Sequence, residues 1–126
     1  MSEELQVLIV EDSPTARQQM IQIVEDAGYS YLVAEDGETA IELIKQHHPE
    51  VVILDIVLPK KNGYQVCRAI KADPELAIKV LMVTAKDQEN DRIWGHRQGA
   101  DGYLSKPIEK DELLAVLETM ITAIHE

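Results

Sequence analysis

The sequence predicts an α/β fold in which one parallel sheet of five strands is covered by helices on both faces. Strand-like apolar runs alternate with helix-like segments five times along the 126 residues. The run Val51–Leu54 is apolar throughout and rich in β-branched residues, as in a strand buried on both faces. The length suits one compact domain. We therefore expect a doubly wound (βα)5 domain.

The first half of the chain supplies three strands and two helices. The run Leu5–Val10 precedes Pro14, which suits the first turn of a helix that has Asp12 or Ser13 as its N-cap. Gly28 is a typical residue at the end of this helix. The remaining segments are a strand at Tyr29–Ala34, a helix at Glu38–His47 that stops before Pro49, and a strand at Val51–Leu54.

The second half of the chain continues the alternation. The last predicted helix reaches residue 124, so we expect one domain over residues 1–126 with no output domain. The predicted segments are a helix at Asn62–Lys71, a strand at Ile78–Val83, a helix at Asp87–Gln98 closed by Gly99, a strand at Gly102–Leu104 and a helix at Glu109–Ile124 with an apolar side.

The composition disfavours several classes of partner. A net charge of −11 argues against nucleic-acid binding, which needs cationic side chains on the phosphates. No apolar run approaches the roughly 18 residues that span a bilayer, and no signal peptide is visible, so we expect a cytoplasmic protein without a membrane partner. Cys67 is the only cysteine, which excludes an internal disulfide and indicates a small buried thiol.

Four of the predicted strands lead into residues that carry polar chemistry. Glu11 and Asp12 follow the first strand, and Asp55 follows the third. Thr84 follows the fourth strand, and Lys106 comes shortly after the fifth. The carboxyl ends of parallel strands lie on one edge of a sheet, where ligands of open α/β folds bind. The sequence thus predicts three carboxylates, a hydroxyl and an ammonium at one site.

This set of residues matches the needs of phosphoryl transfer. Clustered carboxylates repel one another and favour a bound cation, and oxygen ligands without histidine or cysteine favour Mg²⁺. An aspartate can attack a phosphoryl group, which makes Asp55 the predicted nucleophile. Lys106 can neutralise one phosphoryl oxygen, and Thr84 can donate a hydrogen bond to another.

Five blocks of the sequence follow one another in order: Val10-Glu11-Asp12, Leu54-Asp55, Leu58-Pro59 with Asn62-Gly63, Val83-Thr84-Ala85, and Tyr103-Leu104-Ser105-Lys106-Pro107. Together these blocks resemble the receiver domain of two-component response regulators. The resemblance extends from Val7 to Met120 and implies a CheY-like (flavodoxin-like) fold with strand order 2-1-3-4-5 and a signalling switch rather than an enzyme. Residues 84–89 and 94–100 resemble the stand-alone, PilH-type receivers of chemotaxis and twitching motility.

The resemblance assigns a role to each acidic residue. Asp55 would receive a phosphoryl group from a histidine kinase or a phosphotransfer domain in a phosphorelay. Asp12 and Asp55 would bind Mg²⁺ directly, together with the backbone carbonyl of Val57. Glu11 stands where many members of the family have aspartate, and its longer side chain would hold the metal through water.

The resemblance also implies how the signal leaves the site. Lys106, the backbone of Ala85 and the hydroxyl of Thr84 would stabilise the phosphoryl group. Thr84 and Tyr103 would form a switch that changes the face made by the fourth helix, the fifth strand and the fifth helix. That face would bind a downstream motility or signalling protein, and the protein itself would be a monomer or a weak dimer. The residues predicted for the partner surface are Arg92, His96 and Tyr103.

Two residues beside the predicted site suggest a long-lived phosphate. Val57 lies two residues after Asp55, and Lys86 lies two residues after Thr84. In the family these positions flank the path of the hydrolytic water. Neither an isopropyl group nor an ammonium is suited to orient that water for attack. We therefore expect slow hydrolysis of the Asp55 phosphate.

Four other functions remain as alternatives. A phosphate sink for a shared kinase would use the same site. A haloacid-dehalogenase-like phosphatase needs a second aspartate two residues after the nucleophile, where this chain has Val57. A flavodoxin-like redox carrier needs a loop that cradles phosphate, whereas Glu11 and Asp12 would repel it. A receiver that works without phosphorylation would not need the full set of Asp12, Asp55, Thr84 and Lys106.

Overall fold

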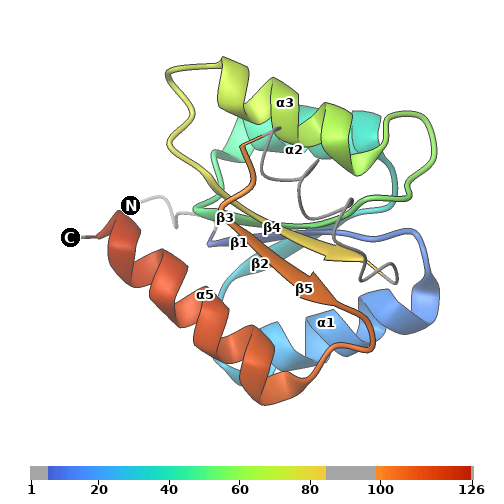
Figure 1. Cartoon of the computed structure of the whole chain (residues 1–126), viewed down its shortest axis with the longest axis vertical. Helices are drawn as coiled ribbons and strands as arrows, with labels where there is room; N and C mark the ends of the chain where they lie inside the picture. Colours follow the sequence, from blue (N-terminus) through green and yellow to red (C-terminus); the bar gives the residue numbers. More distant parts are fainter. Residues whose placement is uncertain (1–5, 85–98, 126) are drawn as a thin grey trace.

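Five parallel strands form one sheet in the order β2-β1-β3-β4-β5, which confirms the predicted fold and strand order. The structure is a computed structural model that describes residues 6–84 and 99–125, with the backbone alone at Thr84 (Figure 1). The strands are β1 (Val7–Val10), β2 (Tyr31–Ala34), β3 (Val51–Asp55), β4 (Lys79–Thr84) and β5 (Gly102–Ser105), and the described helices are α1 (Pro14–Asp26), α2 (Gly37–His47), α3 (Gly63–Ala72) and α5 (Lys110–Ile124).

The sheet lies between two layers of helices. Helices α1 and α5 cover one face, and α2 and α3 cover the other (Figure 1). Successive strand residues point to opposite faces, so each central strand contributes to two apolar clusters. Leu8 and Val52 pack under α2 and α3, whereas Ile9 and Ile53 pack under α1 and α5. The central strands are therefore buried on both sides, as their apolar sequence predicts.

The second strand is shorter than predicted because Tyr29, its first predicted residue, belongs to the end of α1. Gly28 has a φ of 85° and its amide donates to the carbonyl of Glu25. The amide of Tyr29 then donates to the carbonyl of Val24 at 3.2 Å, which closes the helix. Strand β2 consequently begins at Tyr31 instead of Tyr29.

Two strand–helix connections are fixed by side-chain caps. Ser13 is the N-cap of α1, where the sequence left a choice between Asp12 and Ser13. Asn62 and Gln65 form a reciprocal capping box at the start of α3, with distances of 2.9 and 3.0 Å. The next residue, Gly63, lies against the chain just after β3, since a Cβ there would come within 2.3 Å of the carbonyl oxygen of Asp55.

The first strand begins at Val7 rather than at the predicted Leu5, and, β2 aside, the other described helices and strands differ from the predicted bounds by at most one residue. Asp55 itself belongs to β3, where it pairs in register with Val83. The predicted helix at Asp87–Gln98 lies outside the described residues. In the part of the chain that is described, no helix is both long and apolar enough to span a membrane. Cys67 is buried, and burial raises the pKa of its thiol to about 11.

Candidate functional site

Three carboxylates meet at the carboxyl edge of the sheet. Glu11 and Asp12 follow β1, and Asp55 ends the neighbouring strand β3. One carboxylate oxygen from each lies within 4.8 Å of the others. Glu11 and Asp55 are buried, with 0% and 6% of their surface exposed, whereas Asp12 is exposed. The cluster is thus sealed on the protein side and open to solvent at Asp12.

Lys106 joins this cluster from the loop after β5. Its Nζ lies 2.5 Å from Oε1 of Glu11 and 2.9 Å from Oδ2 of Asp55. The side chain is 20% exposed, and the peptide bond between Lys106 and Pro107 is cis. One ammonium is therefore shared by the two buried carboxylates.

The two ends of this ion pair have shifted pKa values. Burial raises the pKa of the Glu11 carboxyl, and the nearby Asp55 carboxylate adds to the rise, while Lys106 and the amide of Ser13 oppose it. Burial alone would lower the pKa of Lys106, but Glu11 and Asp55 together hold it above its ordinary value. Lys106 therefore stays protonated between these carboxylates.

Backbone amides hold the remaining carboxylate oxygens. The amide of Val57 donates to Oδ1 of Asp55 at 3.2 Å, and the amide of Ser13 donates to Oε2 of Glu11 at 3.1 Å. Among the described residues, Oε1 of Glu11 has no well-aligned hydrogen-bond donor, although Lys106 lies close to it. Both buried side chains are thus fixed from two directions.

The arrangement suits a hard divalent cation. Its donors are carboxylate oxygens, which Mg²⁺ prefers over nitrogen or sulfur. The carboxylate of Asp12 is exposed and accepts no hydrogen bond from another described residue, so its oxygens are available to a cation. The residues present therefore fit the magnesium that the sequence predicts.

Arg17 belongs to this site but was not predicted from the sequence. Its Nη1 donates to the backbone carbonyls of Glu11 and Asp12 at 3.3 and 3.4 Å, and to Oε1 of Glu35 at 3.2 Å. Its place in the first turns of α1 is the one available signal, because long side chains near the start of a helix lean back toward its N-terminus.

The other predicted residues are distributed as follows. The side chain of Val57 is 62% exposed, so it faces solvent beside Asp55. Tyr103 is half-buried on β5 and packs against the cluster under α2 and α3. Thr84 ends β4, opposite Ser105 of β5. The side chain of Thr84, together with Ala85, Lys86, Arg92 and His96, lies outside the described residues.

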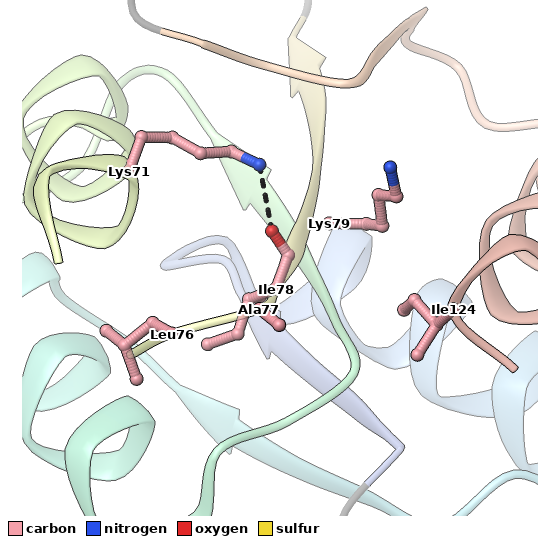
Figure 2. Close-up of a pocket in the computed structure, with 6 residues that line it drawn as sticks. All are labelled: Lys71, Leu76, Ala77, Ile78, Lys79 and Ile124. Atoms are coloured by element: carbon pink, nitrogen blue, oxygen red, sulfur yellow. Dashed lines mark hydrogen bonds between the residues drawn. The ribbon is translucent and has the colours of Figure 1, made fainter. Parts of the chain in front are cut away.

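A cavity of about 290 Å³ lies away from these residues (Figure 2). It is near the start of β4 and the end of α5, so it faces the amino edge of the sheet rather than the carboxyl edge. The ammonium of Lys71 donates a hydrogen bond to the carbonyl of Ile78 at 2.9 Å and also forms an ion pair with Asp101. The lining residues are Lys71, Leu76, Ala77, Ile78, Lys79 and Ile124.

Comparison with known proteins identifies the family. Residues 7–118 match the model of the response regulator receiver domain. The chain belongs to this family. It is 43% identical to protein PilH of Pseudomonas aeruginosa over 91% of this chain and 96% of PilH. It spans about half the length of several other curated response regulators that it matches.

Solved structures agree with this family. The chemotaxis protein CheY4 of Vibrio cholerae superposes with a TM-score of 0.85 at 28% identity, covering 94% of this chain and 99% of CheY4. The receiver domain of a sensor histidine kinase from Pseudomonas aeruginosa was solved with a magnesium ion in its active-site cleft. It superposes with a TM-score of 0.87 at 26% identity, covering 95% of this chain and 99% of that domain.

Membership in the family decides among the function classes. Receiver domains are signalling switches that bind Mg²⁺ at an acidic site and interact with histidine kinases and downstream targets. The phosphatase and redox-carrier alternatives therefore no longer apply. This chain has a cluster of three carboxylates, Glu11, Asp12 and Asp55, that could hold a metal ion.

The shared ion pair predicts how stability responds to pH in a Lys106→Met variant. At about pH 8 the variant should lose about 2 kcal/mol of unfolding free energy, because hydrogen bonds to charged groups contribute about 1.5–3 kcal/mol. Without Lys106 the pKa of Glu11 rises further, so the folded protein binds a proton more readily than the unfolded chain. Lowering the pH to about 5 therefore favours the folded state, and the loss should shrink.

Urea unfolding at both pH values measures this difference. Lys106→Arg keeps the positive charge and serves as the control, with a smaller loss that changes less with pH. A loss in Lys106→Met that stays constant or grows toward about pH 5 would contradict the account.

Proposed function

We propose that this protein is a response regulator that accepts a phosphoryl group on Asp55. One observation carries the proposal. The Asp55 carboxylate is buried at the end of β3, within reach of Glu11 and Asp12, while one of its oxygens contacts Lys106 and the other accepts a backbone amide. The carboxylate is thereby held in one orientation beside a positive charge, as in-line attack on phosphorus requires.

The proposed donor is the phosphohistidine of a histidine kinase or of a phosphotransfer domain. An oxygen of Asp55 attacks the phosphorus atom, the bond between phosphorus and the histidine nitrogen breaks, and that nitrogen keeps the electron pair. Asp12, Asp55 and the carbonyl of Val57 would hold Mg²⁺, with Glu11 acting through water. When bound, the metal neutralises phosphoryl oxygens as a Lewis acid.

The remaining groups around Asp55 are proposed to stabilise the product. Lys106 already lies 2.9 Å from Asp55, so a small movement would bring its ammonium to the phosphoryl oxygens. The hydroxyl of Thr84 and the backbone amide of Ala85 would bind another phosphoryl oxygen. Thr84 ends β4, the strand next to β3, and Ala85 follows it in the sequence.

The proposed output is a change of surface next to β5. Movement of Thr84 toward the phosphoryl group would let Tyr103 turn inward, which biases a two-state surface by a local change in charge. The proposed face is the one that the sequence predicts, with the helix expected at Asp87–Gln98, β5 and α5, and its proposed partner contacts are Arg92, His96 and Tyr103. Similarity to PilH supports a downstream role in type IV pilus motility, in the cytoplasm.

Phosphorylation can be tested with a small-molecule donor. Intact-mass measurement after incubation with acetyl phosphate and Mg²⁺ should show one added phosphoryl group on the wild type. Asp55→Asn should show none, because the amide is not a nucleophile toward phosphorus. Asp26→Asn removes an exposed carboxylate on α1 and should react like the wild type. A folded wild type without the adduct, or an Asp55→Asn variant with it, would refute the proposal.

The lifetime of the phosphate is the second test of this reaction. The exposed apolar side chain of Val57 cannot orient a water beside Asp55, so Val57→Asn should speed the loss of phosphate by about tenfold, or about 1.4 kcal/mol of barrier. The decay is followed by mass after removal of the donor. A slow wild-type decay favours a signal transmitter over a phosphate sink, because a sink must turn over quickly.

Lys60→Asn provides the matched control for this experiment. It introduces the same amide in the same loop, and asparagine tolerates the positive φ of 67° found there. Its decay rate should equal that of the wild type. Equal rates in Val57→Asn and the wild type would count against a role for Val57 in hydrolysis.

A further inference from the structure

Arg17 connects three parts of the chain beside the acidic site. The residue lies in the first turns of α1, and its side chain is 20% exposed. Its guanidinium donates to the carbonyls of Glu11 and Asp12, both in the turn that follows β1. It also pairs with Glu35, the residue directly after β2. One side chain thus spans the β1–α1 turn and the end of β2.

These contacts act on the backbone of the acidic turn rather than on its carboxylates. The side chain of Glu11 is held by Lys106 and by the amide of Ser13. The side chain of Asp12, in contrast, is exposed and accepts no hydrogen bond from another described residue. The backbone of Asp12 therefore directs its side chain toward Asp55. Arg17 binds the backbone carbonyl of Asp12.

We propose that Arg17 is a positioning residue for divalent-cation binding. By holding the carbonyls of Glu11 and Asp12, its planar guanidinium fixes the turn so that the carboxylate of Asp12 stays near that of Asp55. The proposal rests on the proposed function for the identity of the cation, Mg²⁺. Arg17 is not itself a ligand, but the geometry of the ligands depends on it.

Arg17 has two opposite effects on the affinity for Mg²⁺, which makes the proposal easy to refute. Its positive charge repels a cation, so removal of the charge alone would tighten binding. Its hydrogen bonds order the turn, so their removal would weaken binding. The ion pair with Glu35 reduces the repulsion, and Glu35 itself is 72% exposed, where such a pair contributes little to stability. We expect positioning to outweigh repulsion.

Calorimetric titration with Mg²⁺ separates the two effects. Arg17→Gln should bind Mg²⁺ about tenfold more weakly than the wild type, as is common when a group that orients metal ligands is removed. Arg17→Lys keeps the charge but lacks the Nη1 donor that makes all three contacts, so it should still bind Mg²⁺ more weakly than the wild type. Glu35→Gln removes the charge that offsets Arg17 but leaves the contacts to the carbonyls of Glu11 and Asp12, so it should weaken binding less than Arg17→Gln does. Equal or tighter binding by Arg17→Gln would overturn the proposal.

A second measurement needs no metal and tests Arg17 separately from the proposed function. In the metal-free protein, hydrogen exchange at the amide of Ser13 reports on the turn, since this amide donates to Glu11. Arg17→Gln should speed this exchange about tenfold more than it speeds exchange in the central strands, which follows global stability. Unchanged exchange at Ser13 would refute the role of Arg17. A wild type that exchanges as expected but binds no Mg²⁺ would instead refute the proposed function.

Discussion

The ammonium of Lys106 makes the rest of this site possible. Glu11 and Asp55 are both buried, and two buried carboxylates so close together are costly without a counter-charge. Lys106 contacts both, at 2.5 and 2.9 Å. The parallel sheet brings the three side chains from β1, β3 and the loop after β5 to one edge, and the ammonium makes their proximity stable.

In the proposed reaction, the same arrangement would give the site two alternative charge states. Lys106 is held by Glu11 and Asp55 together, so new negative charge on Asp55 competes with Glu11 for the ammonium. A cation held by Asp12 and Asp55 would neutralise part of the negative charge of the carboxylates. In the proposed reaction, these exchanges couple Asp55 to β5, which leads directly into Lys106 and carries Tyr103.

Sequence patterns predicted the frame of this site but not all of its contacts. Val51–Leu54 indicated a buried strand, and a parallel sheet then required Asp55, Glu11 and Lys106 to share an edge. The start of β2 was predicted two residues early, because Tyr29 closes α1 instead. Arg17 was missed because it binds backbone carbonyls, and the position of a carbonyl is not encoded in the type of residue that carries it.

A crystal structure with Mg²⁺ and beryllofluoride, which mimics a phosphoryl group, tests the central claim most directly. We expect beryllium bonded to an oxygen of Asp55, a metal ion between Asp12 and Asp55, and Lys106 moved from Glu11 onto a fluoride. An unmodified Asp55 with Lys106 still on Glu11, under conditions where the protein is folded, would contradict it.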